Sequence, residues 1–135
     1  MTRWAASLHY TFRMNELRRC PRYPSFARAR VAGFHEGDAL LRDLSITGCR
    51  LEFSAAIAFS LQQRCRITVM PEDRASVEAF DLEASALWSR ADYDTFEIGF
   101  TIEASPKGKS FERYVDYLAW KAGQADAGAL ESVRA

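Results

Sequence analysis

Hydrophobic side chains in the middle of the chain recur with a period of two. Five segments show this alternation of apolar and polar positions: residues 38–46, 49–53, 65–69, 80–88 and 96–102. Successive side chains of a strand point to opposite faces, so each segment is expected to be a strand with one buried face. The pattern is typical of an antiparallel sheet that covers a core on one side.

These strands follow one another without helices between them. Turn-like stretches separate them at residues 33–38, 71–76 and 90–94, which favours a closed barrel over an open sheet. The period then changes, because Phe111, Tyr114, Val115 and Leu118 form one helical stripe. We therefore divide the chain into three parts: an N-terminal arm at 1–27, a β-barrel at 28–103, and a C-terminal helix and tail at 104–135.

Composition limits the class of protein. With 135 residues and 48% hydrophobic positions, the chain fits one domain with a sizeable core. No stretch approaches the roughly 20 apolar residues of a membrane span, so membrane insertion is not expected. The three cysteines, Cys20, Cys49 and Cys65, are odd in number and lack a CxxC spacing, which argues against disulfides and a zinc site. A reducing cytoplasm is the expected compartment.

The charge is neutral overall but unevenly distributed. The formal net charge is zero, yet residues 13–30 hold six arginines against the single acid Glu16. Pro21 and Pro24 forbid a regular helix in this region, so we expect an extended loop. An anionic ligand should dock at this end, because arginine suits bidentate and stacking contacts.

Two short motifs lie about twenty residues apart. The first is Arg18-x-x-x-Arg22, and the second is Asp43-x-Ser45-x-x-Gly48. Arginine forks match phosphate oxygens and the O6/N7 edge of guanine, while Asp and Ser can take its Watson-Crick edge. Together these residue types describe a site for a guanine nucleotide.

The motif pair resembles the PilZ domain, whose pattern is RxxxR before the first strand of a small barrel and [DN]xSxxG within it. The resemblance covers residues 17–100 and implies a mainly β fold: a small antiparallel six-stranded PilZ-like β-barrel with an N-terminal arm and a C-terminal α-helix. It implies cyclic di-GMP as ligand, bound by Arg18, Arg22, Asp43, Ser45 and Gly48. Arg19 is a further candidate contact, and Trp88 lies where family members often present an aromatic side chain near the ligand.

The strand pattern predicts how this site is arranged. Asp43 and Ser45 are two residues apart and should face outward, while Leu44 and Ile46 enter the core. Gly48 is expected at the turn, where a missing Cβ permits a positive φ or a close approach of a base. The neighbouring arm is predicted to be mobile and to fold over the barrel when ligand binds. For Trp88, a position in the core or at the barrel rim is at least as strong an interpretation as ligand contact.

Three functions compete. The first is a cytoplasmic cyclic di-GMP receptor that relays the messenger to an unidentified effector protein in motility, biofilm formation or another process. The second is a PilZ-like interaction module that does not bind nucleotide. The third, a nucleic-acid-binding barrel, is disfavoured by the neutral net charge, so DNA or RNA is not expected as a partner. No catalytic constellation, metal site or cofactor motif is present in the sequence, and we do not expect an enzyme.

Overall fold

A computed structural model describes residues 20–33, 37–105 and 108–134, with side chains described as far as Gln124. Arg18 and Arg19, and with them most of the predicted arm, lie outside the described residues. The remaining site candidates, Arg22, Asp43, Ser45, Gly48 and Trp88, all lie within them.

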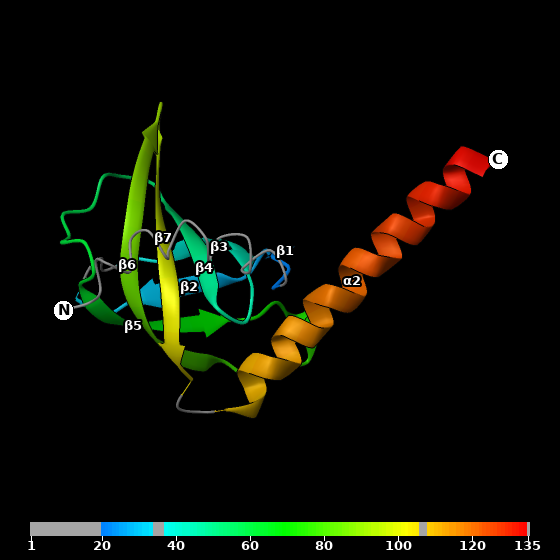
Figure 1. The fold of residues 1–135 in the computed structure, drawn as a ribbon, viewed down its shortest axis with the longest axis horizontal. Helices are drawn as coiled ribbons and strands as arrows, with labels where there is room; N and C mark the ends of the chain where they lie inside the picture. The colour runs from blue at the N-terminus through cyan, green and yellow to red at the C-terminus, as the bar shows by residue number, and fades with distance from the viewer. Residues whose placement is uncertain (1–19, 34–36, 106–107, 135) are drawn as a thin grey trace, which may run out of the picture.

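The architecture is a closed antiparallel barrel with one extra strand and a C-terminal helix (Figure 1). The strands pair in the order β1-β3-β2-β5-β6-β7-β4, and a β3–β4 pairing closes six of them into the barrel, with β1 beside β3. Their bounds are β1 Tyr23–Pro24, β2 Arg28–Val31, β3 Ala39–Leu44, β4 Gly48–Phe53, β5 Arg64–Met70, β6 Phe80–Asp92 and β7 Thr95–Ala104, with a 3-10 turn, η1, at Asp73–Ala75. The predicted mainly β fold and six-stranded barrel are confirmed.

The barrel interior is filled by the apolar positions of the alternating pattern. Every second residue of β4 and β5 is buried, and β6 and β7 continue the same core. The largest fully buried side chains include Phe53, Phe80, Phe100, Leu41, Leu51 and Ile98. One prediction was wrong: Ile46 is 62% exposed, because β3 ends at Leu44 and Ile46 lies in the turn to β4.

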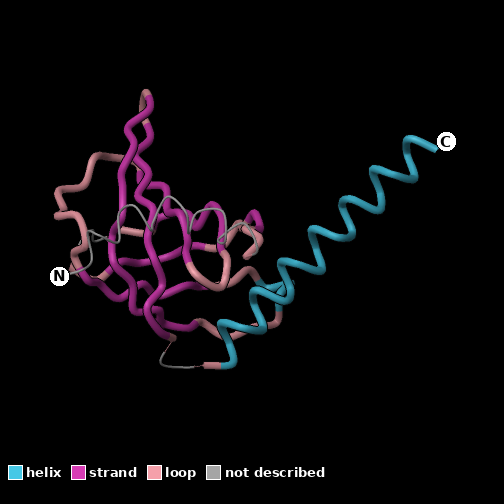
Figure 2. The backbone as a smooth tube through the Cα atoms, in the orientation of Figure 1, coloured by secondary structure: helices cyan, strands magenta, loops and turns pink. Residues whose placement is uncertain are grey.

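Helix α2, Lys109–Arg134, closes one end of the barrel with its first turns and then extends away from it (Figure 2). The predicted stripe of Phe111, Tyr114, Val115 and Leu118 is buried. The Tyr114 hydroxyl donates to Glu72 Oε1 at 2.6 Å and lies 2.8 Å from Ser25 Oγ. This contact joins α2 to the segment that follows Arg22. Within the described residues, no helix is long and apolar enough to cross a membrane.

Register shifts change which side chains face outward. They occur at three places: between Leu41 and Asp43 in β3, and between Glu83 and Ala84 and between Ala86 and Trp88 in β6. A bulge adds a residue to one strand and redirects the side chains beyond it. Simple alternation would place Trp88 on the buried face of β6, but it is absent from the core and lies against Gly99, whose neighbours Ile98 and Phe100 point inward. Trp88 therefore belongs to the outer face, and the core interpretation of this residue was wrong.

Candidate functional site

The two halves of the motif pair meet on the outer face of β3. Strand β1 follows directly after Arg22 and pairs with the end of β3, with Pro24 opposite Asp43. This pairing holds the guanidinium of Arg22 beside the carboxylate of Asp43, with Nη1 3.6 Å from Oδ1. Two residues 21 positions apart in the sequence thus form one ion pair, whereas their role in ligand binding stays a prediction.

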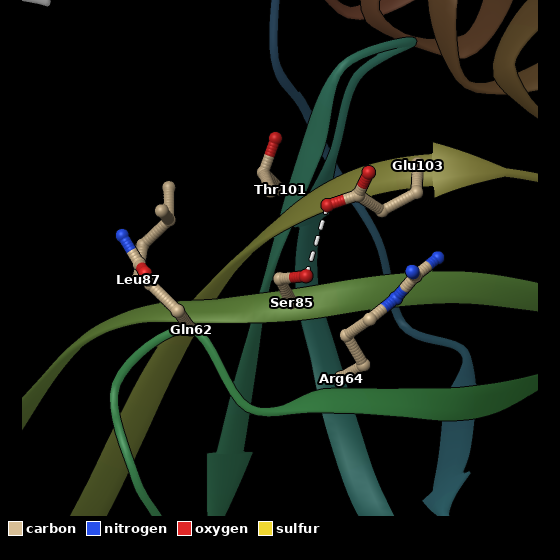
Figure 3. A pocket seen from close by; sticks show the side chains of 6 residues that line it. All are labelled: Gln62, Arg64, Ser85, Leu87, Thr101 and Glu103. Carbon is tan, nitrogen blue, oxygen red and sulfur yellow. Dashed lines mark hydrogen bonds between the residues drawn. The ribbon is translucent and has the colours of Figure 1, made fainter. Parts of the chain in front are cut away.

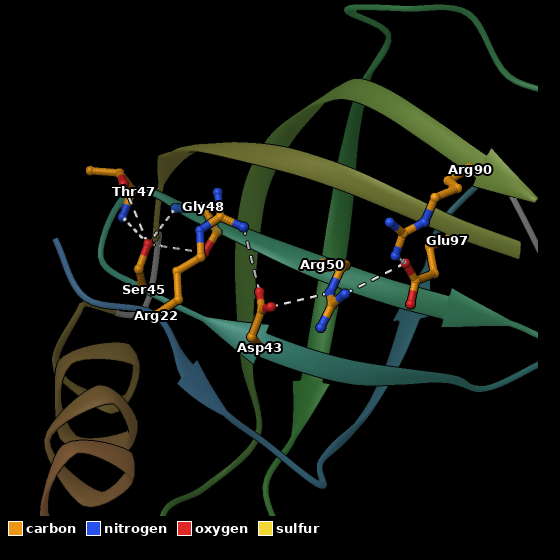
Figure 4. A network of polar contacts seen from close by, with 8 residues as sticks. All are labelled: Arg22, Asp43, Ser45, Thr47, Gly48, Arg50, Arg90 and Glu97. Atoms are coloured by element: carbon orange, nitrogen blue, oxygen red, sulfur yellow. Dashed lines mark hydrogen bonds and ion pairs between the residues drawn. The ribbon is translucent and has the colours of Figure 1, made fainter. Parts of the chain in front are cut away.

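Asp43 is one member of a row of alternating charges that crosses four strands (Figure 4). Arg50 of β4 reaches Asp43 Oδ2 with its Nε at 3.1 Å and Glu97 of β7 with its Nη1 at 3.5 Å. Arg90 of β6 contacts the same Glu97 oxygen at 2.7 Å. The row holds three cations and two anions, so its field favours an anion.

One oxygen of Asp43 is left with hydrogen-bonding capacity. Oδ1 is buried and has no hydrogen-bond partner among the described residues, although Arg22 is its ion-pair neighbour. A buried acceptor without a hydrogen bond costs free energy, on the order of 1–3 kcal/mol. A ligand that donates N–H groups to this carboxylate would recover that cost.

Ser45 was predicted to face outward, but the structure buries it. Its side chain is 1% exposed, and its Oγ accepts hydrogen bonds from the backbone N–H of Thr47 at 3.2 Å and of Gly48 at 3.1 Å. Serine hydroxyls hold tight turns in this way, in competition with other partners. In this arrangement Ser45 shapes the β3–β4 turn that presents Asp43 and Gly48.

Gly48 is the first residue of β4 and has no positive φ. Its importance is close approach, because a Cβ at this position would lie 2.9 Å from the carbonyl oxygen of Phe100 and 3.7 Å from Arg22 Nη2. The carbonyl oxygen belongs to the neighbouring strand β7, so the glycine is required by the close approach of that backbone. The predicted positive φ and the placement within the turn were therefore wrong, whereas close approach of a base to Gly48 stays a prediction.

Trp88 lies flat against the backbone of β7. A Cβ built on Gly99 would overlap the indole ring, and Gly99 pairs with Trp88 on one side and Arg50 on the other. The ring therefore borders the polar row at the position next to Arg50. A purine bound at Asp43 would find an aromatic surface two strands away.

We expect Gly99→Ala to displace the Trp88 ring and to lower the free energy of unfolding by about 1–3 kcal/mol. Thermal denaturation followed by tryptophan fluorescence measures both effects. In a Trp88→Ala background the same substitution should cost little, since the clashing ring is gone. Equal costs in the two backgrounds would contradict the stated contact between Trp88 and Gly99.

Cys49 and Cys65 offer no reactive thiolate at neutral pH. Burial raises the pKa of the Cys65 thiol to about 11, with the Glu83 carboxylate adding to the effect. Burial also raises the pKa of Cys49, assisted by Asp43. Among the described residues, no group of three or more His, Cys, Asp and Glu side chains could hold a metal ion.

Sequence reasoning missed Arg50, Glu97 and Arg90. A signal for Arg50 was available, because it follows Gly48 by two residues and alternates with the buried Cys49 and Leu51. A hairpin turn after Leu44 then places Arg50 beside Asp43. Glu97 and Arg90 depend on the pairing of β7 with β4 and β6, which strand pattern alone does not give.

Comparison with known proteins gives the fold but no sequence family. No family model matches the chain, and no curated protein matches its sequence. Among solved structures, the chain is similar to the inhibitor of motility MotI/DgrA of Bacillus subtilis, with a TM-score of 0.65 and 12% sequence identity. The match covers 76% of this chain and 49% of that protein, so the chain spans about half the neighbour's length. At this identity, the two proteins share a fold.

Proposed function

We propose that this protein is a PilZ-like receptor for cyclic di-GMP that passes the signal to a protein partner by conformational change, without catalysis. The observation that carries this proposal is the meeting of Arg22 and Asp43 on one outer face of the barrel. The guanidinium suits a phosphate or the O6/N7 edge of guanine, and the carboxylate beside it suits the Watson-Crick edge of the same base. Arg18 and Arg19 belong to the same proposed site.

Recognition of guanine rests on Asp43. Its carboxylate accepts from the N1–H and N2–H groups of guanine, an arrangement that adenine does not match because its N1 is an acceptor. The buried Oδ1, which has no hydrogen-bond partner in the described structure, is the atom best suited to this contact. Arg22 and Arg50 supply positive charge for the phosphates on either side of it.

The same geometry offers a route from binding to output. A guanine edge at Asp43 competes with the 3.6 Å ion pair to Arg22, so binding shifts Arg22 toward the ligand. Three residues later, Ser25 contacts Tyr114 of α2. A movement of the Arg22 segment is thereby transmitted to the helix, which extends from the barrel as a surface for a partner.

The name of the structural neighbour, an inhibitor of motility, supports a partner in the motility apparatus. The alternative function is an interaction module that does not bind nucleotide. One observation favours it: Asp43 already has two arginine partners, which is how a purely structural ion-pair network would look. We expect the protein to act in the cytoplasm under either function.

Isothermal titration calorimetry tests the proposal. The full chain is titrated with cyclic di-GMP at near-physiological salt, with GTP and cyclic di-AMP as controls. Saturable binding of cyclic di-GMP alone, at micromolar affinity or tighter, supports a receptor. Absence of heat at several temperatures together with no thermal shift would reject it in favour of the interaction module.

A further inference from the structure

A second polar pocket, with a volume of about 200 Å³, opens on the outer face of β5, β6 and β7. Six residues line it: Gln62, Arg64, Ser85, Leu87, Thr101 and Glu103. Figure 3 shows the Ser85 hydroxyl directed at the Glu103 carboxylate, to which it donates at 2.9 Å. Arg64 approaches from the neighbouring strand, so the pocket presents an anion, a cation and a hydroxyl together.

Strand register connects this pocket to the Asp43 site. Gly48 pairs with Thr101, Thr101 with Ser85, and Ser85 with Arg64. Directly paired residues of antiparallel strands point to the same face, so these four form one row across four strands. Neighbouring strands are about 4.8 Å apart, so the pocket begins roughly 5 Å from Gly48.

Arg22 stands at the near end of this row. Its Nη2 lies 3.7 Å from the position that a Cβ on Gly48 would occupy, so the guanidinium lies against this glycine. One guanidinium therefore lies between the Asp43 carboxylate and the new pocket. A phosphate bound by Arg22 would then have one base at Asp43 and the other base in the pocket.

Leu87 gives the pocket an apolar wall. It lies two residues after Ser85, so ordinary alternation places both side chains at the pocket. The register shift between Ala86 and Trp88 then brings Trp88 to the same outer face, against Gly99. Consecutive residues of β6 therefore give the pocket and the Asp43 site each a hydrophobic edge on which a purine can pack.

We propose that this pocket binds the second guanine of the dinucleotide, with Glu103 accepting from its N1–H and N2–H groups and Arg64 contacting its phosphate. The proposal rests on the function proposed above. Glu103 uses Oε2 for Ser85, and a carboxylate with about four lone-pair sites retains capacity for two further donors. Asp43 and Glu103 would then read the two bases by the same chemistry from opposite ends of one ligand.

A hybrid ligand tests this assignment directly. Cyclic GMP-AMP offers one guanine to Asp43 and presents adenine to Glu103. The wild-type protein should bind it about ten- to a hundredfold more weakly than cyclic di-GMP. Glu103→Gln should weaken cyclic di-GMP binding by a similar factor while leaving the hybrid unchanged or tighter, because an amide pairs with adenine. The control is Glu78→Gln, which replaces an exposed carboxylate in a loop and should change the affinity for neither cyclic di-GMP nor cyclic GMP-AMP.

A second test concerns Arg64, and Arg66 serves as its matched control. Arg66 lies two residues along β5 on the same face and is paired with Glu83 at 2.9 Å, outside the pocket. Arg64→Ala should weaken cyclic di-GMP binding about tenfold, whereas Arg66→Ala should leave it within twofold. Equal effects of the two substitutions would reduce Arg64 to a general contribution to surface charge and overturn its assigned contact.

The outcomes separate this inference from the function on which it rests. If wild-type protein binds neither ligand, the receptor function fails and the inference fails with it. If cyclic di-GMP binds, but Glu103→Gln weakens both ligands equally or neither, the receptor stands and the second guanine lies elsewhere. Only a loss confined to cyclic di-GMP supports the proposal.

Discussion

We expect Asp43→Ala to weaken cyclic di-GMP binding by about a hundredfold or more. The substitution removes the proposed acceptor of two guanine N–H groups, including Oδ1, which lacks a hydrogen-bond partner in the described structure. It also releases Arg22 and Arg50 from their ion pairs. Positive charge at the site therefore rises, and affinity for GTP or inorganic phosphate should stay the same or increase. Selectivity is lost while attraction for anions is kept.

Asp38→Ala is the matched control for this experiment. Asp38 is also an aspartate between two arginines on the barrel surface, 2.7 Å from Arg30 and 3.8 Å from Arg28. Its hydrogen bond with Arg30 holds the pKa of Asp38 below its usual value, so Asp38 is ionised at neutral pH. We expect calorimetry to give wild-type affinity for Asp38→Ala. Retained affinity in Asp43→Ala would remove this residue from the site.

The barrel and its core were predictable because they depend on alternation alone. A strand with one face in the core must repeat apolar residues every two positions, and β5 does so with Cys65, Ile67 and Val69. The stripe on α2 was predictable for the same reason at helical spacing. Such patterns reflect the burial of apolar side chains, which is the dominant favourable contribution to the free energy of folding.

The details of the site were less predictable because they depend on local irregularities. The bulge before Trp88 inserts one residue and reverses the face on which that side chain lies. Ser45 turns inward because its hydroxyl finds two backbone N–H groups within its own turn. Neither effect is visible in the alternation of apolar and polar residues along the sequence. The motif pair singled out Arg22 and Asp43 by residue type rather than by period, and the structure brings these two side chains within 3.6 Å of each other.

The largest effect on stability is expected at Tyr114. Tyr114→Ala should lower the free energy of unfolding by about 3–5 kcal/mol, or roughly 10–20 °C in melting temperature. The side chain is fully buried, packs against Phe80 with ring centroids 6.0 Å apart, and hydrogen-bonds to Ser25 and Glu72. Thermal denaturation followed by circular dichroism measures the loss. Trp120→Ala is the control on the same helix, because that ring is 61% exposed, and it should cost less than about 1 kcal/mol.

Tyr114→Phe separates the hydroxyl from the ring. It keeps the packing but leaves Glu72 and Ser25 without this hydrogen bond, at a cost of about 1–3 kcal/mol. A cost near zero would show that the hydroxyl does not help to fix α2 on the barrel. In that case the proposed link from Arg22 through Ser25 to the helix would lose its physical basis.

The pH dependence of stability gives an independent measurement of the same hydroxyl. Burial, and then the hydrogen bond to Glu72, raise the pKa of Tyr114 in the folded state. Above about pH 10 the unfolded chain releases this proton while the folded protein retains it, so stability falls as pH rises, by up to about 1.4 kcal/mol per pH unit. Tyr114→Phe should remove this contribution, so denaturant titrations between pH 9 and 11 should show a shallower decline in the variant. Parallel declines would mean that Tyr114 ionises alike in both states and would contradict the raised pKa.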